Sequence, residues 1–168
     1  MPTYYHYTTV EHWKDIEKDG FIKLTESNAS LKEEHYAPDV VWLFAEPLKT
    51  VPKMMYATVQ NTQTKKIANF QQSKAQLEIH VILERQHVTR ADKFLKKHGT
   101  SEEDMKRLEV AGGLKLKQQY VCVHQIPVAH IARLIIRKDL AEMRKRISDS
   151  DMLRYYGQVR ETGEGITQ

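Results

Sequence analysis

Two carboxylates and an imidazole share one side of the segment LEIHVILE at residues 77–84, a combination able to transfer protons or to stabilise a developing positive charge. Glu78, His80 and Glu84 occupy the polar side of this alternating pattern, which predicts a central strand. The carboxylates reach a cleft if that face of the strand is open. The alternation itself favours a simpler interpretation, in which they are ordinary edge or surface charges.

The N-terminal segment TYYHYTT at residues 3–9 places a second imidazole among aromatic and hydroxyl side chains. Alternate residues of a strand face the same way, so Tyr4, His6 and Thr8 are expected on one face. A strand histidine is commonly satisfied by one structural hydrogen bond, so His6 alone is weak evidence of a site. Cys122 alternates into another predicted strand, where a lone cysteine is typical of a small buried apolar residue rather than a nucleophile.

Common metal, cofactor and nucleophile motifs are absent from the sequence. There is no HExxH pair, and His124 and His130 flank a proline turn without nearby cysteine or acidic residues, so we expect no metal. The sequence also lacks a GxxxxGK[ST] loop, a GxGxxG turn and a GxSxG elbow. These absences argue against phosphate-loop, Rossmann and α/β-hydrolase enzymes.

Length and composition favour a single soluble domain. The chain has 168 residues, 40% of them apolar, which is sufficient for a core of its own. No window is apolar enough to span a membrane and the first residues lack a signal-peptide pattern, so we expect a cytoplasmic protein without membrane contact. The single cysteine excludes an intrachain disulfide. A net charge of +4 permits attraction to nucleotides or nucleic acid but is far below that of a dedicated DNA-binding protein.

Hydrophobic periodicity predicts about six strands with helices at the flanks and ends, which favours an α+β domain. The predicted strands are 3–9, 21–24, 40–45, 77–84, 118–124 and 131–137, and the predicted helices are 10–19, 53–59, 89–97, 101–110 and 138–147. Residues 25–39 are predicted to form a long loop, and 60–76 have no clear pattern. Gly112 and Gly113 are interpreted as a turn ending a helix. We expect one domain over residues 1–156 and a flexible polar tail over 157–168.

Basic residues gather in two segments, within residues 93–97 and 137–146. Such segments are typical of solvated helical faces. They form a groove for a polyanion only if the fold brings them together.

Three segments, taken in order, carry a family resemblance. The first is YYHYTTVEHWKDIEKDGFI, the second is VVWLFAEPLKTVPKMMY, and the third is KQQYVCVHQIPVAHI. Together they resemble the ADP-ribosyltransferase fold, in particular the His–Tyr–Glu class of diphtheria toxin and the poly(ADP-ribose) polymerases, including its small bacterial, phage and DNA-targeting members. The resemblance implies a split β-sheet of about six strands with flanking helices, and a cleft for NAD.

The resemblance also implies roles for individual residues. His6 corresponds to the histidine that binds the ribose in the adenosine half of NAD. Tyr56 corresponds to the tyrosine that stacks on nicotinamide, with Tyr36 in the long loop as its competitor. The implied catalytic residues are His6, Tyr56 and Gln119, and the implied NAD contacts are His6, Tyr7, Thr8, Phe44, Tyr56 and Tyr36.

Gln119, with Gln118 as its alternate, falls where the family carries glutamate. Breaking the bond between nicotinamide and ribose develops an oxocarbenium-like charge, which a carboxylate stabilises. A glutamine accepts a hydrogen bond from the ribose hydroxyl but supplies no charge. Members of the fold without the glutamate include mono-ADP-ribosyltransferases and RNA 2′-phosphotransferases, so the resemblance leaves activity open.

The sequence therefore predicts an NAD-dependent ADP-ribosyltransferase, a glycosyltransferase that takes NAD as substrate and modifies a nucleic acid or a protein. A toxin, a defence system or a phage counter-defence system is the expected setting. The alternative is a catalytically silent module that binds a nucleotide or nucleic acid in the same cleft. A third possibility, an inhibitor or interaction protein, has only the long loop in its favour.

Overall fold

The computed structural model of the protein describes residues 1–25, 37–60, 69–141 and 143–145. The strands are β1 (Thr3–Thr8), β2 (Phe21–Ile22), β3 (Val41–Phe44), β4 (Tyr56–Gln60), β5 (Asn69–Ser73), β6 (Leu77–Ile82), β7 (Thr89–Arg90), β8 (Gln119–Cys122), β9 (Ile126–Pro127), β10 (Ile131–Ile136) and β11 (Met143–Lys145). The helices are α1 (Val10–Asp19), α2 (Ala91–Lys97) and α3 (Glu102–Gly112), with short 3₁₀ helices η1 (Lys53–Met55), η2 (Arg85–His87), η3 (Leu116–Gln118) and η4 (Val128–His130).

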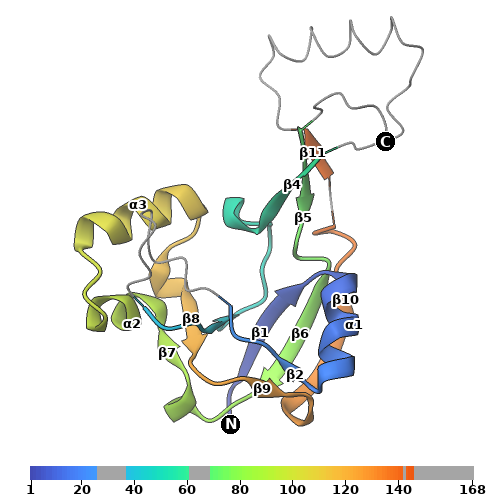
Figure 1. Ribbon diagram of the computed structural model, residues 1–168, viewed down its shortest axis with the longest axis horizontal. Coiled ribbons are helices and arrows are strands. Elements are labelled where there is room, and N and C mark those ends of the chain that lie inside the picture. The colour runs from blue at the N-terminus through green and yellow to red at the C-terminus, as the bar shows by residue number, and fades with distance from the viewer. Residues whose placement is uncertain (26–36, 61–68, 142, 146–168) are drawn as a thin grey trace, which may run out of the picture.

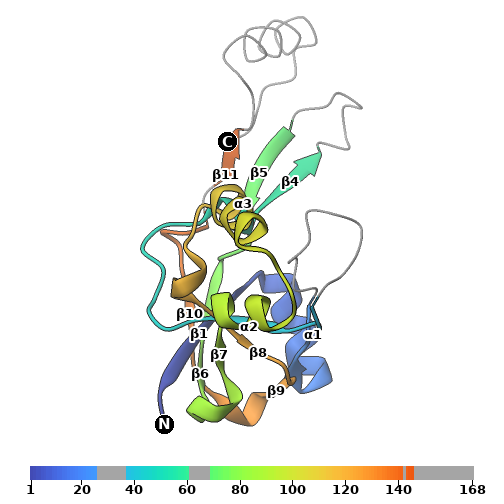
Figure 2. The same cartoon turned by 90° about the vertical axis from the view of Figure 1, so that its left-hand side faces the viewer.

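The body of the described fold is a six-stranded sheet with the order β10-β6-β1-β3-β8-β7, in which neighbouring strands are antiparallel. A three-stranded sheet, β11-β5-β4, projects from one end of this body in both views (Figures 1 and 2). A two-stranded sheet, β2-β9, lies near α1. The expected mixture of helices with a sheet of about six strands is confirmed.

Local sequence signals determine where the helices begin and end. The side chain of Thr9 accepts a hydrogen bond from the backbone of His12 at 3.2 Å, and so caps α1. Gly20 then ends α1 in the left-handed conformation, with φ of 83°. Ser101 caps α3 in the same way by accepting from the backbone of Asp104 at 3.1 Å. These caps confirm the predicted boundaries of both helices to within about two residues.

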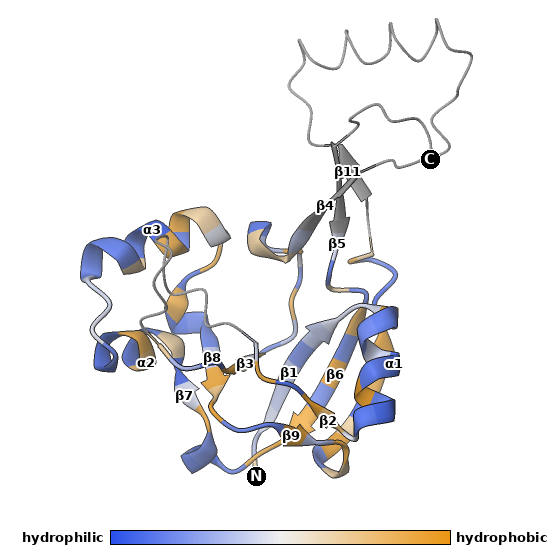
Figure 3. Cartoon of the chain, viewed as in Figure 1, coloured by the Kyte–Doolittle hydropathy of each residue, from blue (hydrophilic) through white to orange (hydrophobic). Residues whose placement is uncertain are grey.

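Apolar side chains pack into three clusters around the six-stranded sheet. One cluster joins alternate residues of β1, β3 and β6 to Ile16 of α1 and to the β2-β9 pair. A second joins Val121 of β8 to α2. A third joins β1 and β3 to Leu48 and Leu140, which lie outside regular strands. Hydrophobic and hydrophilic residues alternate along β6, and α1 has a hydrophilic side (Figure 3).

Two predicted helices are wrong over much of their length. In the predicted helix 53–59, only η1 forms a helical turn, and the chain then enters β4, which pairs with β5 from Tyr56 opposite Ser73 to Gln60 opposite Asn69. Pairing with β5, a strand in the segment that had no clear pattern, overrides the helical preference of the preceding methionines.

The predicted helix 138–147 is replaced by a turn and β11, which pairs with β5. Leu140 is buried in the third cluster, so its three-residue spacing from Met143 is not the repeat of a helix. Ile147, Tyr36 and the expected tail at 157–168 lie outside the described residues. Among the described residues, no helix has the length and hydropathy needed to cross a membrane.

Candidate ligand-binding pocket

The strand register separates the residues that the family resemblance implies. Tyr5 pairs with Phe44, and Phe44 pairs with Gln119, so these three residues form a row on one face of the sheet. Tyr7 follows Tyr5 on that face. Its ring packs edge-on against the ring of Phe44, with the two ring centroids 5.6 Å apart. His6 lies on the opposite face, as does Thr8. The structure therefore brings Tyr7, Phe44 and Gln119 together but does not bring His6 to them.

The imidazole of His6 on β1 forms a hydrogen bond with the backbone of the neighbouring strand β3. Its Nδ1 lies 2.9 Å from the carbonyl oxygen of Trp42. Because a carbonyl can only accept, Nδ1 carries the proton. Burial lowers the pKa of His6, and the hydrogen bond to Trp42 offsets only part of this effect. His6 is therefore a neutral donor that stabilises the sheet, and its role in binding NAD stays a prediction.

The other two implied catalytic residues belong to different sheets. Tyr56 begins β4 in the three-stranded sheet, whereas Gln119 begins β8 in the six-stranded sheet. Gln119 is buried, with 3% of its surface exposed. Its neighbour Gln118 ends η3 and is exposed. The catalytic roles of Tyr56 and Gln119 stay predictions.

A pocket of about 620 Å³ lies where β3 ends and β8 begins. One wall is the segment 45–53, and the other is formed by residues 113–118 between α3 and β8. Phe44, Leu48 and Tyr120 contribute its apolar part. The volume is within the range of pockets that hold small organic ligands. Of the residues implied by the resemblance, Phe44 and the alternate Gln118 line this pocket.

Positive charge dominates the polar lining of the pocket. Lys49, Lys53 and Lys117 line it, together with a single acidic residue, Glu46. All four residues are exposed, and within the described part of the chain none of the three lysines forms an ion pair. Lysine ammonium groups on apolar walls create a positive potential that attracts anions.

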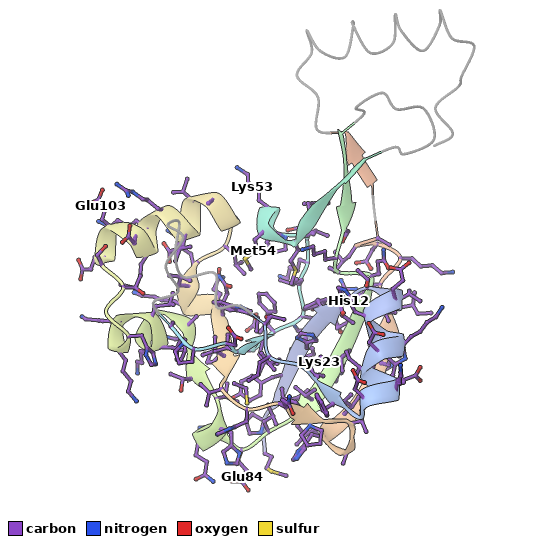
Figure 4. The ribbon with its side chains drawn as sticks, in the orientation of Figure 1. His12, Lys23, Lys53, Met54, Glu84 and Glu103 are labelled. Carbon is purple, nitrogen blue, oxygen red and sulfur yellow. The ribbon has the colours of Figure 1, made fainter. Side chains whose placement is uncertain are left out.

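The two walls meet at the glycine pair Gly112 and Gly113, where α3 ends. A Cβ atom on Gly113 would lie 3.2 Å from Cγ of Lys53 and 3.3 Å from its backbone nitrogen, and one on Gly112 would lie 3.3 Å from Sδ of Met54. Gly113 also has a φ of 71°. Lys53 and Met54 lie on η1, near the end of α3 (Figure 4). The absence of side chains at the glycine pair therefore lets η1 pack closely against the end of α3, in addition to forming a turn.

The segment 45–51, which we call the wall segment, is attached to the fold through Leu48. The backbone N–H of Leu48 donates to the hydroxyl of Tyr7 at 2.7 Å. Its carbonyl oxygen accepts from Nη2 of Arg137 at 2.8 Å. Among the described residues, these are the backbone hydrogen bonds that connect the wall segment to the rest of the fold. The side chain of Leu48 packs in the third apolar cluster.

Glu78 joins the two residues that hold Leu48. Its Oε2 accepts from the hydroxyl of Tyr7 at 2.8 Å and from Nη1 of Arg137. Its Oε1 accepts from Nε2 of His80 at 2.6 Å. We call Tyr7, Glu78 and Arg137 the Leu48 clamp. The carboxylate of Glu78 thus accepts hydrogen bonds from three side chains.

The clamp is buried and charged. The side chain of Glu78 is 3% exposed and that of Arg137 is 16% exposed. Burial alone would raise the pKa of Glu78, but hydrogen bonds from His80, Tyr7 and Arg137 outweigh burial and lower the pKa. The interpretation of Glu78 as an edge or surface charge is therefore wrong, because two neighbouring strands and Arg137 cover it. Glu84 is exposed, as that interpretation predicted, at the end of the fold away from η1 (Figure 4).

Comparisons with known proteins identify no relative of this chain. The chain matches no protein-family model, and no similar protein was found among curated proteins or solved structures.

The pocket lysines and the joint role of the clamp residues were not predicted from the sequence. Lys49 and Lys117 have no motif around them, and Arg137 was counted only as one of the basic residues. A signal for Arg137 exists in its position at the end of a predicted strand, beside Asp139, to which it donates from Nε at 3.0 Å.

Proposed function

We propose that the protein binds a phosphate-bearing nucleotide in the pocket between residues 44–53 and 113–120. The observation that carries this proposal is a pocket of about 620 Å³ that combines apolar side chains with three lysines, none of which forms an ion pair within the described residues. The phosphate groups of a nucleotide would form charge-assisted hydrogen bonds with the lysine ammonium groups. Its nucleobase would pack on the apolar side chains. This is the nucleotide-binding alternative that the sequence left open.

The separation of His6 from Gln119 favours binding over the full family chemistry. In the His–Tyr–Glu class, the resemblance implies that these positions act on one NAD molecule. Here they lie on opposite faces of one sheet. Gln118 supplies an exposed amide at the pocket, which is able to accept and donate hydrogen bonds to a ligand without contributing charge.

Calorimetric titration with NAD, ADP-ribose and ADP tests the proposal. Lys49→Gln and Lys117→Gln should each weaken binding by about tenfold, because each removes a charge-assisted hydrogen bond. Lys97→Gln is the matched control, since Lys97 is an exposed lysine of α2 outside the pocket. Equal affinities for all three variants, or no binding of any nucleotide to the unaltered protein, would refute the proposal.

A second candidate function is cleavage of NAD in this same pocket. It is favoured by Phe44 and Gln118, which belong to the positions implied by the resemblance, and by Glu46, which offers the carboxylate that Gln119 lacks. In this reaction the bond between C1′ of the ribose and the nicotinamide nitrogen breaks, and neutral nicotinamide leaves. A new bond then forms between C1′ and water or an acceptor, whose proton passes to solvent. Glu46 would stabilise the developing positive charge.

Release of nicotinamide from NAD, followed by chromatography, distinguishes the two functions. If the protein cleaves NAD, Glu46→Gln should lower the rate by at least about a hundredfold while NAD still binds. Glu84→Gln is the control, because Glu84 is an exposed glutamate that does not line the pocket. NAD binding without nicotinamide release leaves the binding function and excludes this second one.

A further inference from the structure

We infer that the Leu48 clamp is a positioning device for the pocket, so that Tyr7, Glu78 and Arg137 set nucleotide affinity without touching the nucleotide. The inference rests on the proposed function, because it concerns the affinity of the same pocket. None of the three clamp residues lines the pocket, whereas Leu48 and its neighbour Lys49 do.

The first step of the argument is that the wall segment has few attachments of its own. Residues 45–51 contain no regular helix or strand. Several of its side chains are exposed, while Leu48 is 8% exposed. A segment of this kind opens at a low free energy unless it is held at particular points. Within the described fold, Leu48 is that point, because both of its backbone polar groups are bonded to the clamp.

The second step is that the clamp is itself fixed by parts of the chain far from the pocket. Tyr7 comes from β1, Glu78 from β6, and Arg137 follows β10. Adjacent strands hold the first two residues, since Tyr7 pairs with Glu78 in the register of β1 and β6. Burial is the main reason that the pKa of Tyr7 is raised, so its hydroxyl keeps the proton that it donates to Glu78. The wall segment is thereby attached to three neighbouring strands of the sheet.

The third step concerns Asp139, which orients the guanidinium from the other side. Nε of Arg137 donates to Oδ1 of Asp139 at 3.0 Å, and Nη2 donates to Oδ2 at 2.7 Å. The same Nη2 donates to the carbonyl of Leu48. A bidentate pair fixes the plane of a guanidinium. Asp139 is 60% exposed, so it can be changed with little effect on the core.

These contacts predict that loosening the clamp weakens binding by lowering the fraction of molecules with a formed pocket wall. When only a fraction of the protein is competent to bind, the apparent dissociation constant rises by the inverse of that fraction. A ligand must then also order the wall as it binds. Lys49 follows Leu48 directly, so displacement of Leu48 displaces one of the pocket's positive charges.

The test uses Tyr7→Phe in the full-length protein, with ADP as the probe. This change removes one hydroxyl and keeps the ring that packs on Phe44. Tyr4→Phe is the matched control, since Tyr4 is a buried tyrosine of the same strand whose hydroxyl has no hydrogen-bond partner in the described part of the chain. We expect Tyr7→Phe to weaken ADP binding by about tenfold, as loss of one clamping bond implies, and Tyr4→Phe to leave it unchanged.

Amide hydrogen exchange of the ligand-free protein distinguishes local loosening of the wall segment from destabilisation of the whole fold. In Tyr7→Phe, exchange at Leu48 and the rest of the wall segment should become faster, while exchange in β6 keeps its rate relative to Tyr4→Phe. If Tyr7→Phe does not fold, Asp139→Asn replaces it, with an expected two- to threefold weakening of ADP binding and faster exchange at Leu48.

The outcomes separate this inference from the proposed function. Absence of ADP binding by the unaltered protein refutes the proposed function, while the exchange measurement still tests whether the clamp holds the wall. Unchanged exchange at Leu48 in the folded variant refutes the clamp. Faster exchange together with unchanged ADP affinity refutes the positioning role and leaves the pocket in place.

Discussion

The Leu48 clamp and the adjoining pocket both contain charged side chains, but these side chains differ in burial and in pairing. In the clamp, the carboxylate of Glu78 is buried and accepts hydrogen bonds from Tyr7, His80 and Arg137. In the pocket, Lys49 and Lys117 are exposed, and neither forms an ion pair within the described residues.

This difference separates groups that the fold needs from groups that are available to a ligand. Removing one partner of a buried pair leaves an uncompensated charge away from water, which is costly. Removing an exposed and unpaired lysine changes the potential around it but breaks no contact of the fold. The clamp should therefore respond in measurements of stability and the pocket in measurements of binding.

The largest effect that would test the comparison is expected for Arg137→Ala. It leaves Glu78 buried without its cation and should lower the free energy of unfolding by about 3–5 kcal/mol. Lys49→Ala, the control in the pocket, should change it by no more than about 0.5 kcal/mol. Urea denaturation measures both. Similar stabilities for the two variants would show that the clamp is not a buried structural pair.

A smaller effect is expected where the two pocket walls meet. Gly113→Ala should lower the free energy of unfolding by about 2 kcal/mol, because Gly113 has a left-handed backbone and any Cβ crowds Lys53. Gly99→Ala is the matched control, since Gly99 has a φ of 87° but open space around a Cβ atom, and should cost about 1 kcal/mol. Equal losses in thermal or urea denaturation would mean that the contact with Lys53 contributes nothing.

The smallest effect concerns pH and the buried imidazole of His6. The pKa of His6 is lowered from 6.5, mainly by burial, so the unfolded chain binds a proton there more readily than the folded chain. The stabilising contribution of this residue is complete above pH 6.5 and is lost as the pH falls through the lower folded pKa, so a plot of stability against pH has a slope below pH 6.5. His6→Asn should remove that slope in urea titrations at several pH values, and an unchanged slope would assign it to another group.

Glu78 acts at lower pH and with the same sign. Its folded pKa lies below the ordinary value of 4.5, so its contribution is complete above pH 4.5 and is lost as the pH falls through the lower folded value. The clamp is therefore expected to remain intact above pH 4.5.

The sequence predicted the body of the fold well because its signals are local. Alternation in β6 and the caps of α1 and α3 depend on residues close together in the chain. The failures at 53–59 and 138–147 have a common cause, because β4 and β11 form only by pairing with β5, whose own sequence has little strand pattern. Non-local pairing of this kind leaves no periodic signal.

The candidate site was less predictable because contacts distant in sequence create it. The clamp joins Tyr7, Leu48, Glu78 and Arg137, and the Arg137 contacts span 59 and 89 positions. Of these residues, Tyr7 was predicted as an NAD contact and Glu78 was weighed as a carboxylate for a cleft. Alternation along a strand shows which side chains share a face, but it does not show whether another part of the chain covers that face.

The most direct test of the central claim is an NMR titration of the isotopically labelled protein with NAD. If the nucleotide occupies the pocket, amide shifts should change first at Phe44, Lys49, Gly113 and Gln118, and Lys49→Gln should weaken the titration by about tenfold. Shifts centred instead on His6 and Tyr56, or no shifts at millimolar NAD, would contradict the assignment of the pocket.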